Sequence, residues 1–126
     1  MIDLPQEYKQ KMKALLNNDY DAFISTYEAS AMKGLRINTL KVKNKDMFPF
    51  SLSPVPWCKE GFYYINDERP GKDVYHEMGL YYIQEPSAMS VVEALKIEKG
   101  DRVLDMCAAP GGKSTQAACK LDGSGI

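Results

Sequence analysis

A chain of 126 residues, of which 44% are hydrophobic and 26% charged, has the composition of an ordinary globular protein of about one domain. Its formal net charge of -1 excludes a general electrostatic attraction to nucleic acid, so contact with a polyanion would need a local basic patch. No apolar run approaches the roughly 20 residues that a membrane-spanning helix needs, and the N-terminus lacks the apolar core of a signal peptide. We therefore expect a cytoplasmic protein without membrane contact.

Two helices are expected at the N-terminus. Apolar residues recur at helical spacing from Leu4 to Leu16, and again from Tyr20 to Tyr27 after an interruption at 17–19. An aromatic stripe of this kind could stack nucleic-acid bases, but residues on one periodic face are more often buried. We therefore interpret both stripes as core.

Residues 34–40 read GLRINTL and alternate apolar with polar positions. This alternation predicts a half-buried strand, with Leu35 and Ile37 on one face and Arg36 and Asn38 on the other.

The stretch 33–46 around this strand is the one distinctly basic part of the chain. It could be a solvated face beside a strand, which is the usual fate of lysines. It could also contact phosphates, with bidentate contacts from arginine and salt-sensitive attraction from lysines. The residues alone favour neither of these two interpretations over the other. The charged residues of the stretch are Lys33, Arg36, Lys41, Lys43 and Lys45, against Asp46.

The middle of the chain indicates a small α+β unit. Residues 44–50 could form a short helix, and Pro54 and Pro56 exclude a regular helix around them. The aromatic-rich stretch 57–65 predicts a strand or hairpin. The turn-rich sequence at 66–72 is the expected break in the front part of the chain.

A second strand and a helix are expected at 79–95. LYYIQ predicts the strand, and the helix should start near Pro86. Gln84 and Glu85 fall at the junction, where they would cap the helix and add charge near its N-terminus.

The three cysteines, Cys58, Cys107 and Cys119, are widely spaced, and His76 is the single histidine. With no C-x-x-C pair, the sequence indicates neither a zinc site nor a disulfide framework, so we assign no metal ligand and expect reduced thiols. Cys107 is a candidate nucleophile, but the sequence shows no neighbouring histidine or carboxylate arrangement that would activate its thiol. We interpret Cys107 as a small residue that lines a loop, and His76 as a structural or surface residue.

The stretch 101–116, DRVLDMCAAPGGKSTQ, combines a short apolar segment, a loop of small residues and a helix start. Val103 and Leu104 predict a buried strand. The alanines and glycines of the loop let its backbone approach a ligand, and its proline has no N–H to satisfy. The N–H groups and dipole of the following helix suit an anion, to which a lysine adds a full charge. The loop residues are Cys107, Ala108, Ala109, Pro110, Gly111, Gly112 and Lys113.

The spacing of this loop disfavours a nucleoside triphosphate. A P-loop needs a glycine five positions before its second glycine, a position that is Cys107 here, and the G-x-G-x-x-G spacing is absent as well. Asp105 lies near the expected carboxyl end of a strand, and ligands of open α/β sheets bind at that edge. The arrangement favours an adenosyl cofactor that carries an amino-acid moiety.

Three segments together resemble a known family: LRINTLK at 35–41, GLYYIQEPSAM at 79–89 and DMCAAPGGKSTQ at 105–116. In this order they are similar to the Sun/RsmF family of RNA cytosine-5 methyltransferases, which use S-adenosylmethionine. The resemblance implies methyl transfer to C5 of a cytosine in rRNA or tRNA, with the cofactor held by 107–113. We expect RNA rather than DNA as the partner, and a monomeric full-length enzyme. The residues expected to contact RNA are Arg36, Asn38 and Lys41.

The expected fold class is α/β. A small N-terminal α+β domain at 1–72, with a role in RNA contact, would precede the first strand-loop-helix unit of a Rossmann-like methyltransferase domain at 73–126. One such unit cannot bury both of its faces, and the chain stops near Ile126, where a second strand would begin. In the family the two catalytic cysteines follow a proline and a threonine, and this chain has neither a Pro-Cys nor a Thr-Cys pair. We therefore assign no catalytic residue and expect the chain to be inactive alone.

Two other classes of function stay open. A non-catalytic RNA-binding module would rest on the basic stretch, and its binding would weaken steeply with salt. A degenerate nucleotide-binding protein would rest on GGKST, and magnesium-ATP but not S-adenosylmethionine would stabilise it. We prefer the methyltransferase interpretation because it alone explains Asp105, the loop and the two upstream segments together.

Overall fold

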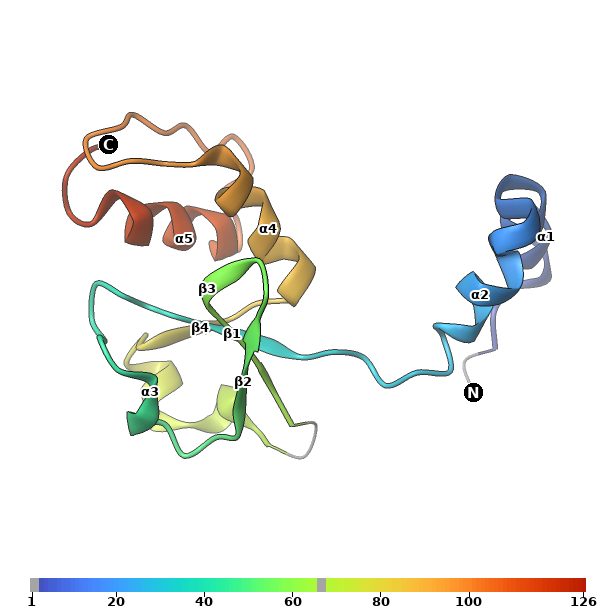
Figure 1. Ribbon diagram of the computed structural model, residues 1–126, viewed down its shortest axis with the longest axis horizontal. Helices are drawn as coiled ribbons and strands as arrows, with labels where there is room; N and C mark the ends of the chain where they lie inside the picture. The colour runs from blue at the N-terminus through green and yellow to red at the C-terminus, as the bar shows by residue number, and fades with distance from the viewer. Residues whose placement is uncertain (1–2, 66–67) are drawn as a thin grey trace. The chain divides into compact units, whose positions relative to one another are not determined.

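The computed structural model describes residues 3–65 and 68–126 (Figure 1). The chain divides into two compact units, one up to Ala31 and one from Met32 onward. Within the described residues, no helix is long and apolar enough to cross a membrane. The domain boundary expected between residues 72 and 73 stays a prediction.

The first unit consists of the two expected helices, joined by a 3-10 turn. The elements are α1 Gln6–Leu16, η1 Asn17–Asp19 and α2 Tyr20–Ser25. Tyr8 and Tyr27 share a hydrogen bond of 2.6 Å between their hydroxyls, and the rings of Phe23 and Tyr27 pack edge to face with centroids 5.5 Å apart. No residue of these elements is buried, so the two stripes make half-buried contacts and do not form the expected core. The physical reason is that two short helices have too little surface between them to bury a side chain completely.

The second unit is built on a four-stranded antiparallel sheet in the order β2-β3-β1-β4. The strands predicted at 34–40, 57–65 and 79–84 are confirmed in position. An additional edge strand runs through Pro54 and carries an irregularity in register between Pro54 and Val55. Proline is tolerated there because an edge strand leaves one side of its backbone unpaired. The strands are β1 Gly34–Ile37, β2 Leu52–Val55, β3 Cys58–Tyr64 and β4 Tyr81–Ile83.

The main apolar core lies on the Leu35 face of the sheet. In register, Leu35 lies opposite Phe62 of β3 and Ile83 of β4. This face packs against Phe48 and Tyr75, which come from the segments around two short helices. The three short helices of this unit are η2 Lys45–Met47, η3 Pro70–Lys72 and α3 Val74–Glu77.

These short helices settle three local expectations. The helix expected at 44–50 is reduced to the single 3-10 turn η2. The loop expected at 66–72 ends in η3, and its first two residues lie outside the described part of the chain. The ring of His76 lies 5.8 Å from that of Tyr81 and its Nδ1 is buried, which agrees with a structural role.

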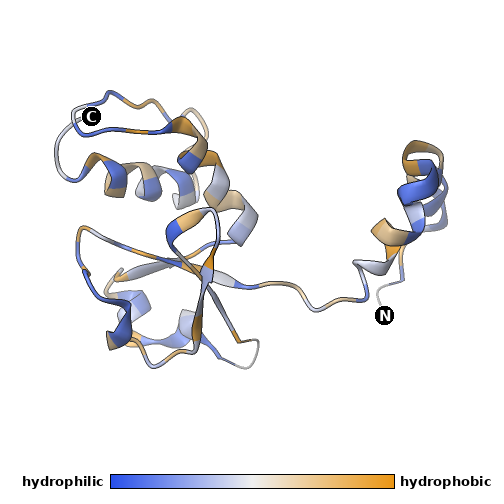
Figure 2. Cartoon of the chain, in the orientation of Figure 1, coloured by the Kyte–Doolittle hydropathy of each residue, from blue (hydrophilic) through white to orange (hydrophobic). Residues whose placement is uncertain are grey.

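The opposite face of the sheet carries Arg36 and is covered by two longer helices, which pack against each other (Figure 1). They are α4 Pro86–Leu95 and α5 Gly112–Leu121. Both hydrophilic and hydrophobic residues lie along α5 (Figure 2). All four residues of β1 are buried, so this strand is not half-buried as its alternation predicts; α4 and α5 enclose the face that carries the polar residue.

The start of α4 follows the sequence signals closely. Pro86 occupies the first turn, and the carboxylate of Glu85 accepts a hydrogen bond of 3.0 Å from the N–H of Ala88. This is the capping role expected for Glu85. Met89 and Val92 face inward and are buried.

The predicted strand at Val103 and Leu104 is not formed. Leu104 is 83% exposed, and no described strand lies beside this segment. The N–H of Ile126 donates to the carbonyl of Asp101, and the N–H of Val103 donates to the carbonyl of Ile126. These two bonds follow the pattern of a parallel ladder around one residue pair, and the N–H of Gly100 also donates to the carbonyl of Ser124.

Candidate cofactor-binding site

The loop 107–113 and the β4–α4 junction enclose a cavity of about 230 Å³. The loop joins the extended segment at 101–105 to the N-terminus of α5, and the junction supplies the facing wall. The cavity wall is therefore made of backbone and small side chains on one side and of larger side chains on the other. The lining residues are Tyr82, Ile83, Gln84, Glu85, Ala88, Cys107, Ala108, Ala109, Pro110, Gly112 and Lys113.

The carboxylate of Asp105 ties the two ends of the loop together. One oxygen accepts the N–H of Cys107 at 3.0 Å, and the other accepts the hydroxyl of Ser114 at 2.6 Å. The Ser114 hydroxyl, and then the Cys107 N–H, hold the pKa of Asp105 below its usual value because both bonds favour the charged form. Asp105, which is half-buried, thus shapes the loop.

We expect acid to release this connection. A carboxylate whose pKa is lowered by folding stabilises the folded state above its unfolded pKa, and that contribution is lost as the pH falls through the lower folded pKa. In a pH titration by NMR, the amide resonances of Cys107 and Ser114 should therefore shift with a midpoint below that of an ordinary aspartate. The variant Asp105→Asn should abolish the titration. A midpoint at or above the ordinary aspartate value would contradict the assigned hydrogen bonds.

Two glycines lie where the loop leads into α5. Gly111 has φ 107°, in the left-handed region that side chains avoid, and it caps the helix. A Cβ at Gly112 would lie 3.4 Å from the Tyr82 ring and 3.5 Å from the Gln84 amide, which is ordinary van der Waals contact, so α5 starts directly beside β4. The peptide bond between Ala109 and Pro110 is cis. The first N–H groups of a helix have no acceptor within the helix, and those of α5 begin at the cavity.

Arg36 holds the loop from the sheet. Its side chain is 1% exposed, and its guanidinium donates to the carbonyl of Gly112 at 3.2 Å and to the Thr115 hydroxyl at 2.8 Å. A third donor, Nε, bonds the amide oxygen of Gln84 at 2.9 Å. Beside it, the hydroxyl of Tyr82 donates to the carbonyl of Pro110 at 3.0 Å.

The three residues predicted to contact RNA meet at a smaller hollow of about 180 Å³. Arg36 points toward the loop and not to solvent, where an RNA phosphate would lie, because α5 covers this face of the sheet. Asn38 donates to the carbonyl of Gly79 at 2.9 Å. Lys41 is exposed and donates to the carbonyl of Met78 at 2.7 Å. Of the three, Lys41 is the exposed residue.

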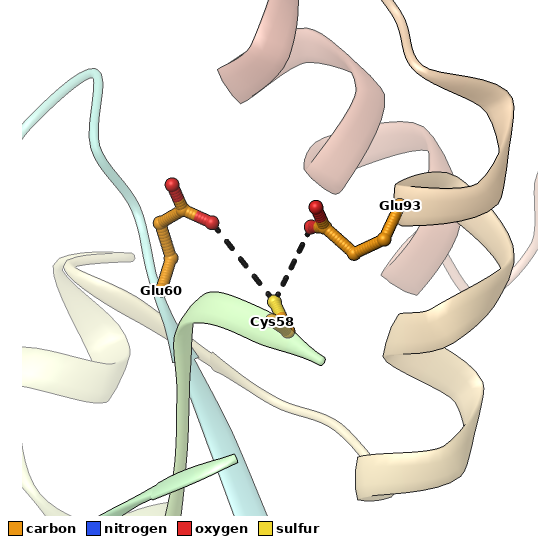
Figure 3. A group of neighbouring side chains, drawn as sticks. All are labelled: Cys58, Glu60 and Glu93. Carbon is orange, nitrogen blue, oxygen red and sulfur yellow. Dashed lines mark hydrogen bonds between the residues drawn. The ribbon is translucent and has the colours of Figure 1, made fainter. Parts of the chain in front are cut away.

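A charged cluster formed by side chains of β3, α4 and α5 was not predicted from the sequence; Figure 3 shows its Cys58, Glu60 and Glu93. Lys120 lies 3.1 Å from a carboxylate oxygen of Glu60 and 2.9 Å from one of Glu93. The thiol of Cys58 points at the same two carboxylates. Burial, and then the charge of Glu93, raise the pKa of Cys58 to about 11, so this thiol stays protonated at neutral pH. Gln116 joins the cluster through a bond of 3.0 Å to Glu93.

The partners of Glu93 keep its carboxylate ionised. Burial alone would raise the pKa of Glu93, but hydrogen bonds from Lys120 and Gln116 together outweigh it and hold the pKa below its usual value. The thiol of Cys58 and the carboxylates of Glu60 and Glu93 have the chemistry and the proximity of metal ligands. Lys120 forms an ion pair with each of the two carboxylates, and we interpret the cluster as an ion-paired support for α5.

The chain matches a known protein family. A family model of the N-terminal domain of 16S rRNA methyltransferase RsmF matches residues 4–86. The chain belongs to the RsmF family. The match covers all four strands and ends at the start of α4, so the sheet that carries Arg36 is the family's N-terminal domain.

Curated RsmF relatives extend the similarity over the loop. Ribosomal RNA small subunit methyltransferase F of Pectobacterium carotovorum is 37% identical over 98% of this chain and 28% of that protein. The protein of the same name from Vibrio parahaemolyticus is 38% identical over 99% of this chain and 29% of that protein. The chain therefore spans less than a third of the length of the curated relatives it matches.

A solved structure agrees with the fold. A methyltransferase homolog protein from Pyrococcus horikoshii superposes with a TM-score of 0.79 at 28% identity, covering 98% of this chain and 43% of that one. The expected resemblance and fold class are thus confirmed: the chain is a partial methyltransferase fold with a mixed helix and strand composition.

Proposed function

We propose that this chain is the N-terminal part of an enzyme that transfers a methyl group from S-adenosylmethionine to C5 of a cytosine in ribosomal RNA. The observation that carries the proposal is the loop 107–113, tied at both ends by Asp105 and leading into the N-terminus of α5 beside a cavity. The names of the RsmF relatives favour rRNA over tRNA as the substrate.

The residues present fit the amino-acid end of the cofactor. The first N–H groups of α5 and the ammonium of Lys113 suit its carboxylate, and the alanines and glycines leave the backbone within reach. The cavity of about 230 Å³ is smaller than the usual range for a whole drug-sized ligand, which suits one end of the cofactor. When bound, S-adenosylmethionine would supply the methyl group on its sulfonium. We assign this contact to Cys107, Ala108, Ala109, Pro110, Gly111, Gly112 and Lys113.

RNA contact in this proposal rests on exposed basic residues of the N-terminal sheet. Lys41 is exposed beside the hollow near Arg36, and Lys43 and Lys45 are exposed next to it along the chain. The proposal includes a monomeric cytoplasmic enzyme that acts on RNA and not on DNA. The chain alone should transfer no methyl group, since it contains neither cysteine motif of the family.

Cofactor binding can be tested through Cys107, which is exposed and lines the cavity. S-adenosylmethionine should slow alkylation of Cys107 by iodoacetamide about tenfold at a concentration of about ten times Kd. Peptide mass spectrometry would locate the modification, and buried Cys58, with its raised pKa, should stay unmodified throughout. Equal protection by magnesium-ATP, or no protection by S-adenosylmethionine, would contradict the cofactor assignment.

The reaction requires the longer protein that contains this chain. Labelled S-adenosylmethionine and small-subunit rRNA should give 5-methylcytosine on nucleoside analysis of the RNA. Methylation at another atom or base would refute the cytosine-5 assignment. Salt-sensitive RNA binding with no transfer would favour the non-catalytic RNA-binding module.

A further inference from the structure

We infer that Arg36 is a positioning residue for the cofactor loop: from the sheet, its buried guanidinium sets the backbone that forms the cavity. The consequence for cofactor affinity rests on the proposed function, whereas the consequence for the loop itself does not. The inference assigns the N-terminal sheet a direct part in building the cofactor site.

Two neighbouring side chains of the sheet hold the loop at two points. Arg36 of β1 lies opposite Tyr82 of β4 in the antiparallel register. Arg36 donates to the carbonyl of Gly112, and Tyr82 donates to the carbonyl of Pro110. The cross-strand pair thus holds alternate carbonyls on either side of Gly111, where the chain takes its left-handed turn.

The contact also orients the groups that face the cavity. The carbonyl of Gly112 and the N–H of Lys113 belong to one peptide group and point in opposite directions. A charged donor on that carbonyl fixes the plane of the group and polarises it, which strengthens the N–H on the other side. Arg36 therefore acts on a backbone donor of the cavity without reaching the cavity itself.

Stability alone does not account for a guanidinium at this position. Within the described residues, Arg36 makes no ion pair, and its donors are met by the neutral oxygens of Gln84, Gly112 and Thr115 and, at 3.8 Å, by the sulfur of Cys119. Burying a charge on neutral acceptors is expensive, and an apolar side chain of similar size often serves a core as well or better.

The experiment is amide hydrogen exchange on this chain with the variant Arg36→Lys, which keeps the charge and loses the planar fork. We expect exchange at the bonded amides of Thr115 and Gln116 to rise about tenfold or more, because a hydrogen bond from a charged donor is lost, while the β1–β3 ladder keeps its protection. Arg69→Lys is the matched control, since it makes the same substitution at an exposed arginine and should change neither region.

Chemical rescue separates positioning from a general loss of packing. In Arg36→Gly, guanidinium at a low, non-denaturing concentration should restore protection at Thr115 and Gln116, and urea at the same concentration should not. The hollow of about 180 Å³ lined by Arg36 offers the route of entry. If the glycine variant does not fold, Thr115→Val removes one acceptor of the guanidinium and should loosen the same segment.

The outcomes are distinct. Loop exchange that is unchanged in Arg36→Lys, or that rises equally in the sheet, would overturn the inference. The Kd for S-adenosylmethionine, measured by equilibrium dialysis, should weaken about tenfold in Arg36→Lys and stay unchanged in Arg69→Lys. A wild-type chain that binds no cofactor would count against the proposed function, while the exchange data would still decide the role of Arg36.

Discussion

Replacing Gly34 with valine should destabilise the unit from Met32 onward by about 3 kcal/mol, or prevent its folding. A Cβ at Gly34 would lie 2.9 Å from the carbonyl oxygen of Gln84 and 3.2 Å from that of Phe62. The Phe62 oxygen is a backbone atom of β3, and the Gln84 oxygen is a backbone atom of the residue that follows β4. A third contact, at 2.9 Å, is with the ring of Pro86 at the start of α4. No single side chain can rotate to relieve this crowding.

The measurement is urea unfolding of the wild-type and variant chains, with the free energy of unfolding from linear extrapolation. Ser53→Val is a suitable control because it places the same side chain at an exposed position of the edge strand β2, and it should change stability little. A Gly34→Val chain as stable as the control would show that the strands can separate to admit the side chain, contrary to the packing described.

Met89→Ala should cost about 2–5 kcal/mol of the free energy of unfolding. Met89 is 0% exposed and packs with Val55 and Cys58 between the sheet and α4. Truncation removes buried apolar area and leaves a cavity that the surrounding sheet cannot fill, because the packed backbone relaxes only in part. The side chain also lies over Gly61, where a Cβ would come within 2.5 Å of its sulfur.

The matched control is Leu95→Ala on the same helix. Leu95 is 61% exposed, so its truncation should cost well under half as much. Thermal and urea unfolding of both variants would provide the comparison. Equal losses in the two variants would show that the Met89 cluster is not the core that joins α4 to the sheet.

Much of the local structure could be predicted from the sequence, because it depends on residues that are near one another along the chain. Alternation predicted β1, proline and glutamate predicted the start of α4 at Pro86, and small residues with glycine predicted the loop before α5. The segment at Val103 and Leu104 was predicted wrongly as a strand. An apolar run favours an extended backbone, but a strand also needs a neighbouring strand to pair with. No described strand lies beside this segment.

The sequence by itself therefore determined the family, the loop 107–113 and the order of the elements around it. Only the tertiary structure decided the role of Arg36. Its acceptors at Gly112 and Thr115 lie 76 and 79 residues further along the chain, and no periodicity or motif links positions so far apart. An alternating strand shows that Arg36 faces away from Leu35, but α5 must pack on that face before the guanidinium meets the loop instead of water.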